Sequence, residues 1–377
     1  MAEADASSRV SAMDGLRGWA ALSVVIFHFT WEMMGHWRPE FRSYIPAALG
    51  SAQVAVAIFF TLSGYVLTIR RWRRDDNPPY LLAALRRYLR LTIPILTISL
   101  CIYLLMVLRL TPTRAAAKIV DNDFWLGHIA YFDPSFVGML VYALFRAYWV
   151  DLTYAYHPFL WTMVVELWGS LIVFAISQSG RGLREPYTAV LLFLVLFLWV
   201  FPLAACFFIG ALFALLQRDG VLFRNPPTPL ESTVATIIFI VAVFSAAWMH
   251  LPSEEFFFSN FKYLITPALT GSIIVFTGIR SVPVTRLLTA PLSQMLGLLS
   301  FPLYLMHGLI AASFAPALII WTARMGPLDL LDGVLISIAS ILASLAAAPL
   351  LLPVERYTLN FVKRLEWPFG RRAAATG

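Results

Sequence analysis

Long runs of apolar residues, broken by short polar stretches, set the pattern of this chain. A helix needs about 20 mainly apolar residues to cross the hydrocarbon core of a bilayer. We expect ten such segments, at residues 15–34, 52–69, 91–109, 158–177, 186–200, 202–217, 232–250, 263–279, 294–318 and 331–352. The pattern predicts an all-α, polytopic helical bundle, integral to a membrane, with about ten transmembrane helices.

Two parts of this pattern are weaker than the rest. The segments 186–200 and 202–217 are short and are separated only by Pro202, so they predict a tight hairpin. A further apolar stretch, 136–150, contains Arg146 and is interpreted as an interfacial or re-entrant segment. If it crossed the membrane, there would be one more span and the C-terminus would change sides.

Composition strengthens the membrane assignment. Apolar residues make up 60% of the 377 residues, charged residues only 13%, and the mean hydropathy is +0.76. A soluble domain carries roughly 25% charged residues, so a sizeable soluble domain is excluded. Both cysteines, Cys101 and Cys206, lie in apolar runs and imply neither a disulfide framework nor a metal cluster. The N-terminus lacks the layout of a cleaved signal peptide, so the first apolar segment is expected to remain as a helix.

The net charge of +7 is explained by the positions of the basic residues. Ten spans and a cytoplasmic N-terminus would place most of the 28 Lys and Arg in the cytoplasm, as the positive-inside rule requires. The charge therefore needs no nucleic-acid partner, and both termini are expected in the cytoplasm. The chain divides into a short cytoplasmic N-terminus (1–14), a membrane domain (15–352) and a basic cytoplasmic tail (353–377).

The first helix carries the most informative polar residues. Arg17 and His28 are eleven residues apart, which places them on one helix face, roughly 16 Å apart along the axis. Ionisable groups inside spans are costly and usually functional, so this face should line a cavity. His28 would act there as a general base, and Arg17 would hold an anionic donor. The alternative is a structural histidine, with Arg17 extended to the lipid headgroups. Asp14 either caps this helix or lines the cavity.

Two later segments add charged candidates. Arg87 and Arg90 share a face at the start of the third helix and could hold a phosphate, although from these residues alone a basic flank that orients the helix is the simpler explanation. Glu166 is a lone carboxylate in the fourth helix, so we expect a partner, either His28 or an arginine. Beside a histidine it would fix the tautomer of the imidazole, and the alternative is a structural ion pair.

The remaining polar residues are less specific. Tyr304 and His307 lie three residues apart in the ninth helix, where either could line the cavity or bridge helices. The basic run from Arg70 to Arg74 is interpreted as positive-inside charge, and His157 as an interfacial residue.

Taken together, these features resemble the acyltransferase-3 family of polytopic membrane O-acyltransferases. The similarity covers nearly the whole chain and depends on the shared order of several short motifs. These are the opening Met13 to Leu22, the Arg17–His28 spacing, Phe59 to Tyr65 (which contains Ser63), Arg87 and Arg90 before Pro94, Trp161 to Glu166, and Tyr304 to His307.

The resemblance implies transfer of an acyl group, commonly acetyl, to a hydroxyl of a carbohydrate, a lipid-linked glycan or a small molecule. It implies cytoplasmic acyl-CoA, with acetyl-CoA as the expected form, as co-substrate, and no metal. The site residues that it implies are His28 as base, Glu166 as its support, and Arg17, Arg87 and Arg90 for the donor. Asp14, Ser63, Tyr304 and His307 are further candidates for the cavity lining. The expected partners are acyl-CoA, the hydroxyl-bearing acceptor and membrane lipids, and the expected location is a bacterial inner membrane, with a fungal membrane as the alternative.

The resemblance leaves the mechanism and some rival functions open. Direct attack by the acceptor is expected, because neither cysteine is placed as an activated nucleophile. Many family members have a second acidic residue where Leu167 follows Glu166 here. The main rival is a transporter or exporter of a sugar-bearing or acylated metabolite, although the sequence has none of the repeats or paired broken helices typical of transporters. An unrelated membrane-bound O-acyltransferase fold and a non-catalytic family member are two further rivals.

Overall fold

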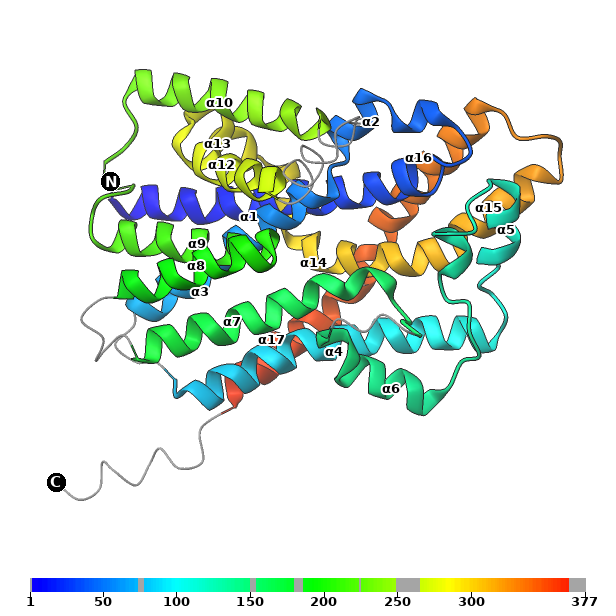
Figure 1. Cartoon of the computed structure of the whole chain (residues 1–377), viewed down its shortest axis with the longest axis horizontal. Helices are drawn as coiled ribbons and strands as arrows, with labels where there is room; N and C mark the ends of the chain where they lie inside the picture. Colours follow the sequence, from blue (N-terminus) through cyan, green and yellow to red (C-terminus); the bar gives the residue numbers. More distant parts are fainter. Residues whose placement is uncertain are drawn as a thin grey trace.

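The structure is a computed structural model that describes residues 2–73, 78–149, 154–179, 186–223, 225–248 and 265–365. Every regular element among these residues is a helix, and they contain no strand (Figure 1). The prediction of an all-α fold is therefore confirmed.

The helices follow one another along the chain with short connections. The α-helices are α1 (Ala2–Phe27), α2 (Tyr44–Leu49), α3 (Ala52–Arg73), α4 (Tyr80–Val107), α5 (Thr113–Ile119), α6 (Phe136–Leu144), α7 (Thr162–Ser179), α8 (Pro186–Val200), α9 (Pro202–Arg218), α10 (Pro229–Trp248), α12 (Thr266–Arg280), α13 (Val282–Leu288), α14 (Pro291–Ala312), α15 (Phe314–Ala323), α16 (Leu330–Ala347) and α17 (Leu352–Arg364). A π-helical turn, η1 (His28–Glu32), continues α1, and the short 3-10 turns include η3 (Leu126–His128) and η5 (Pro158–Trp161).

Within the described residues, seven helical segments are long and apolar enough to cross a membrane. They are Val10–Glu32, Tyr44–Trp72, Tyr80–Val107, Pro158–Gln178, Pro229–Ala247, Pro291–Ala323 and Leu330–Arg364. The pair α12 and α13 would make an eighth, bent by 96°. Helices α8 and α9, with 15 and 17 residues, are shorter than a full span. Helices therefore occur at all ten expected positions, but fewer than ten have the length of a span. Parts of the expected segments 232–250 and 263–279 lie outside the described residues.

The apolar stretch at 136–150 forms a helix that is too short to span. α6 has nine residues, which at 1.5 Å per residue reach only about 14 Å. The Ser135 hydroxyl accepts a hydrogen bond from the backbone N–H of Gly138 and so caps the start of α6. Since the hydrocarbon core is about 30 Å thick, α6 alone cannot cross it.

Two helix boundaries differ from the sequence expectation. α1 begins at Ala2, so the expected short N-terminus is helical and Asp14 lies too far inside the helix to cap it. The first residues of the expected tail form α17, which packs on α4. Hydrophobic patterning identifies the apolar part of a helix, and these polar extensions therefore escaped it.

The crossing of α1 and α14 lies at the centre of the bundle (Figure 1). A Cβ atom on Gly297 would lie 2.5 Å from the carbonyl oxygen of Asp14, and one on Gly18 would collide with the backbone of Gly297. Small residues permit such close approach of helices inside a membrane. The crossing holds the polar face of α1 beside α14, where the cavity described below is found.

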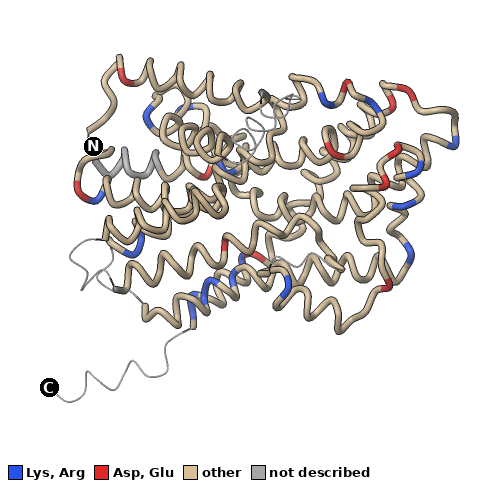
Figure 2. Tube along the Cα trace, viewed as in Figure 1, with Lys and Arg blue, Asp and Glu red and all other residues tan. Residues whose placement is uncertain are grey.

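Lys, Arg, Asp and Glu gather mainly at the two ends of the bundle (Figure 2). The end at which α4 begins and α17 ends is called the α4 end below, and the opposite end, which carries η1, is the η1 end. A basic run at the start of α4 reaches from the α4 end toward the interior (Figure 2). The cytoplasmic placement of the termini stays a prediction.

Candidate functional site

A cavity of about 470 Å³ lies between α1, α3, α4, α7, α14 and α17. This volume falls in the usual range of small-molecule sites, about 300–1,000 Å³. Apolar side chains such as Phe60 and Leu91 line the cavity together with arginines, carboxylates and hydroxyls. Because four of the lining residues are Arg17, Arg70, Arg87 and Arg90, it is called the arginine cavity below.

A buried ion pair joins two of the helices around the cavity. Arg87 Nη2 on α4 lies 3.1 Å from Glu166 Oε1 on α7, close enough for an ion pair but not aligned as a hydrogen bond. Ser63 donates a 2.6 Å hydrogen bond to the same carboxylate oxygen, and Arg87 Nε donates a 2.9 Å bond to Ser170 Oγ. Glu166 Oε2 has no hydrogen-bond partner among the described residues. The partner of Glu166 is therefore an arginine.

The sequence left His28 open as that partner, and the structure does not bring the two together. Phe159, which contacts His28, lies seven residues before Glu166, on the η1 side of it. Glu166 instead faces α4, which supplies Arg87. The carboxylate and the guanidinium stabilise each other's charged forms there, so support of the His28 tautomer by Glu166 is not part of this arrangement.

Arg17 lies on the cavity wall formed by α1. Its Nη1 atom is 3.7 Å from Asp14 Oδ1, one turn earlier on the same helix. Both residues line the cavity, as do Ser63, Arg90 and Tyr304. The residues that the sequence proposed for the donor therefore share one cavity, and Arg70, which the sequence assigned to the loop charge, joins them.

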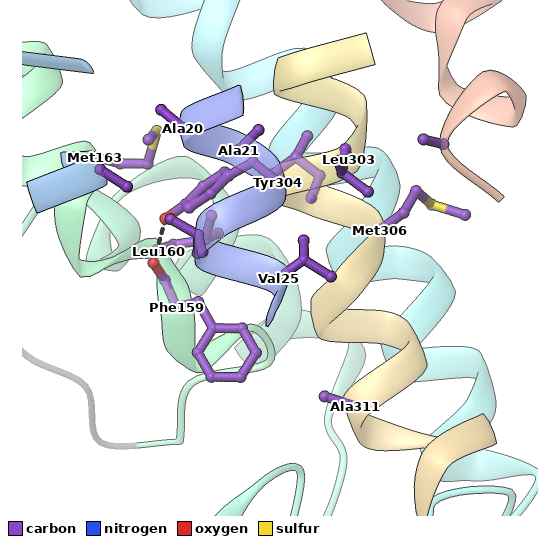
Figure 3. Packing of buried hydrophobic residues seen from close by; sticks show 14 of the residues in the cluster. Ala20, Ala21, Val25, Phe159, Leu160, Met163, Leu303, Tyr304, Met306 and Ala311 are labelled. Atoms are coloured by element: carbon purple, nitrogen blue, oxygen red, sulfur yellow. Dashed lines mark hydrogen bonds between the residues drawn. The ribbon is translucent and has the colours of Figure 1, made fainter. Parts of the chain in front are cut away.

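Tyr304 lines the cavity and links it to η5. Its hydroxyl donates a hydrogen bond to the Phe159 carbonyl (Figure 3). The Thr162 hydroxyl lies 2.7 Å from the Tyr304 hydroxyl and, because the Tyr304 proton is already used, donates to it. Phe159 does not line the cavity, and its ring stacks on His28, so Tyr304, Thr162 and Phe159 stand between the cavity and His28 and are called the wall below.

His28 stands on the far side of that wall. Its ring stacks on Phe159 at 4.2 Å, on His307 at 5.1 Å and on Trp125 at 5.9 Å between ring centroids. His28 opens the π-helical turn η1, a geometry that often marks functional sites. Its Nδ1 atom is buried and has no hydrogen-bond partner among the described residues.

Two further histidines complete a group that is called the histidine cluster below: His28, His157 and His307, with Phe159 and Trp125. His307 is fully buried, and neither of its ring nitrogens has a hydrogen-bond partner among the described residues. His157 Nε2 lies 2.8 Å from the Leu305 carbonyl oxygen, which assigns the proton to Nε2 because a carbonyl only accepts. The rings of His157 and His307 are 6.0 Å apart.

His157 was missed as a site residue because it precedes a helix and carries no motif of its own. It reaches the cluster through tertiary packing against α14, where Gly308 leaves room for its ring. A Cβ at Gly308 would collide with His157 Nε2. No local sequence signal reports such a contact.

The described residues contain no group of three or more His, Cys, Asp or Glu placed to hold a metal ion. The arginine cavity instead offers cations for an anionic group and apolar walls for an uncharged one. The histidine cluster offers unpartnered imidazole nitrogens that can accept a proton.

Comparison with known protein families matches residues 10–352 to an acyltransferase domain, that of the acyltransferase-3 family. No curated protein and no solved structure matches the chain. The matched range runs from residue 10, within α1, through α16, and thus includes both the histidine cluster and all of the arginine cavity except the part that α17 supplies. The chain therefore belongs to the acyltransferase-3 family and is a membrane acyltransferase.

Proposed function

We propose that this protein transfers an acyl group from acyl-CoA to a hydroxyl of a carbohydrate, a lipid-linked glycan or a small molecule, with His28 as the general base. The observation that carries the proposal is the contact between the two groups of residues. Tyr304 lines the arginine cavity and donates a hydrogen bond to the Phe159 carbonyl, and His28 stacks on the ring of Phe159. A thioester in the cavity and a hydroxyl at His28 would therefore meet at this wall.

The chemistry is a direct transfer. The imidazole of His28 accepts the proton of the acceptor hydroxyl as its oxygen attacks the thioester carbonyl carbon. The carbon–sulfur bond breaks, and the imidazolium returns the proton to the departing CoA thiolate. The products are an ester and free CoA, and the histidine is neutral again.

The positions of the cysteines support a mechanism without an acyl-enzyme. Cys206 is buried in α9, where its thiol lies 3.6 Å from the Ala268 carbonyl, and Cys101 is exposed on α4. Neither residue lines the arginine cavity. A stable acyl adduct trapped on the protein would contradict direct transfer.

The test is acetyl-CoA turnover by the purified protein in nanodiscs, followed as release of free CoA with a pool of hydroxyl acceptors. His28→Ala should lower turnover by about 10²–10⁴-fold, the usual contribution of general-base catalysis, while CoA binding is retained. His128→Ala is the matched control, because His128 is exposed in η3 and its ring forms a hydrogen bond with the Asp123 carbonyl in its own loop.

The other outcomes separate the rival hypotheses. Equal turnover in His28→Ala and wild type would remove His28 from the chemistry and make His307 the next candidate base. A wild-type protein that binds no acyl-CoA would contradict the proposed donor and favour transport of an acylated or sugar-bearing metabolite.

A further inference from the structure

Helix α17 begins where the family match ends, yet it forms part of the arginine cavity. It runs from Leu352 to Arg364, packs on α4, and crosses that helix near the α4 end (Figure 1). Glu355, Thr358 and Leu359 face the cavity. One wall of the candidate site is thus built by a segment outside the matched range.

The four arginines of the cavity are not equally available to a ligand. Arg87 is engaged by Glu166 and Ser170, and Arg17 lies next to Asp14. Arg70 and Arg90 form no ion pair or hydrogen bond with any described residue, and both side chains are exposed to the cavity. An incoming anion would therefore meet Arg70 and Arg90 without first breaking a bond.

The charges around Arg90 favour an anion at this place. Arg90 is repelled by Arg87, Arg17 and Arg70, and Glu355 attracts it from the facing helix. Several like charges at the edge of an apolar cavity raise the local concentration of counter-ions. Guanidinium groups bind phosphate oxygens through paired hydrogen bonds, which makes phosphate esters the best chemical fit.

We propose that Arg70, Arg90 and Glu355 form a seat for a phosphate ester anion at the α4 end of the cavity, in which Glu355 competes with the ligand for Arg90. This inference rests on the proposed function, since it assigns the seat to the phosphates of the acyl donor. Thr358, one turn after Glu355, adds a hydroxyl to the same wall. A phospholipid headgroup carries the same phosphate chemistry and is the other source that the experiment must separate.

The experiment measures CoA binding by calorimetry, without turnover, in phosphatidylcholine nanodiscs. Arg70→Gln and Arg90→Gln should each weaken CoA binding by about tenfold or more, because each removes charge-assisted hydrogen bonds to phosphate. Glu355→Gln should tighten CoA binding severalfold, since it removes the competing carboxylate. Pantetheine, which has the thiol arm of CoA but no phosphate, should bind all of these variants as it binds the wild type.

Lys363→Gln is the matched control for loss of positive charge. Lys363 is exposed near the end of α17 and is not part of the cavity lining. Its loss should leave CoA binding unchanged. Weaker binding in Lys363→Gln equal to that in Arg90→Gln would mean that general charge attraction, not a seat, holds CoA, and would overturn the proposal.

Each remaining result supports or overturns the seat separately from the proposed function. Wild-type CoA binding that is unaffected by Arg70→Gln and Arg90→Gln overturns the seat, while acyl transfer through His28 still stands. Weaker binding in Glu355→Gln overturns the competing role of Glu355. If the wild type binds no CoA, native mass spectrometry in phosphatidylglycerol nanodiscs decides. If the protein retains phosphatidylglycerol, and Arg70→Gln and Arg90→Gln lose it, the phosphate seat stands but its ligand is a lipid headgroup and not the acyl donor. If the protein retains no phosphatidylglycerol, both the seat and its assignment to the donor are overturned.

Discussion

The arginine cavity and the histidine cluster lie next to each other, but they differ in whether their buried polar groups have partners. In the cavity, Arg87 is paired with Glu166 and hydrogen-bonded to Ser170. In the cluster, His28 and His307 are stacked on aromatic rings, and ring nitrogens of both are left without partners among the described residues. Buried polar groups normally find partners, so the unpartnered imidazoles mark the place where a transient partner is expected.

The comparison separates binding from chemistry. Charge in the cavity should govern stability and donor affinity, whereas changes in the cluster should govern turnover. The two meet at Tyr304, which lines the cavity, donates a hydrogen bond to the Phe159 carbonyl (Figure 3) and lies 5.7 Å from the His307 ring between ring centroids.

The largest effect on stability is expected from breaking the ion pair of the cavity. Glu166→Gln leaves Arg87, whose side chain is only 9% exposed, without a counter-charge. Removing one member of a buried pair typically costs about 3–5 kcal/mol, and the open cavity should keep the cost near the lower figure. Thermal unfolding in detergent would measure the loss, and the double variant Arg87→Met with Glu166→Leu should recover part of it.

The control for this prediction is an ion pair at the surface. Glu231 and Arg280 lie 2.7 Å apart, but the Glu231 side chain is 52% exposed. Glu231→Gln should change the unfolding temperature little, since exposed ion pairs contribute little to stability. Similar losses in Glu166→Gln and Glu231→Gln would contradict the distinction between a buried and a solvated pair.

The next effect should come from overfilling the histidine cluster. In Gly308→Ala the added methyl group collides with His157 Nε2 and should break the hydrogen bond to the Leu305 carbonyl. Overpacking of this kind typically costs about 1–3 kcal/mol. Because His157 contacts His307, which stacks on His28, turnover should fall while CoA binding is retained.

Gly326→Ala is a matched control for this change. Gly326 follows α15, and an added Cβ would meet nothing within 4 Å. Both unfolding temperature and turnover should stay at the wild-type level. A Gly308→Ala protein that keeps full turnover would show that the position of His157 does not matter to the chemistry.

The sequence predicted the helical class, the positions of the helices and most of the charged residues of the cavity lining, because these depend on local patterns. The Arg17–His28 spacing predicts one helix face that lines one cavity, whereas the structure places Arg17 in the cavity lining and His28 in the histidine cluster. Arg70 belongs to a basic run that the sequence assigned as a whole to positive-inside charge, so its place in the cavity was not predicted. The partner of Glu166, the role of His157 and the position of α17 depend on tertiary contacts, which no spacing along one helix reports.

The smallest effect is expected at the junction itself, and it tests whether the two regions are separate. Tyr304→Phe removes the hydroxyl that bonds the Phe159 carbonyl and accepts from Thr162. The lost hydrogen bonds should cost about 1–2 kcal/mol, because Thr162 and the Phe159 carbonyl are left without this partner. Tyr357→Phe is the control, since Tyr357 is 65% exposed and stacks on Phe361. If the wall keeps the donor apart from His28 until the acceptor arrives, Tyr304→Phe should also raise the hydrolysis of acetyl-CoA in the absence of acceptor, relative to acyl transfer. Unchanged hydrolysis together with the expected loss of stability would mean that Tyr304 only holds α14 against η5, and that the wall is already permeable to the donor.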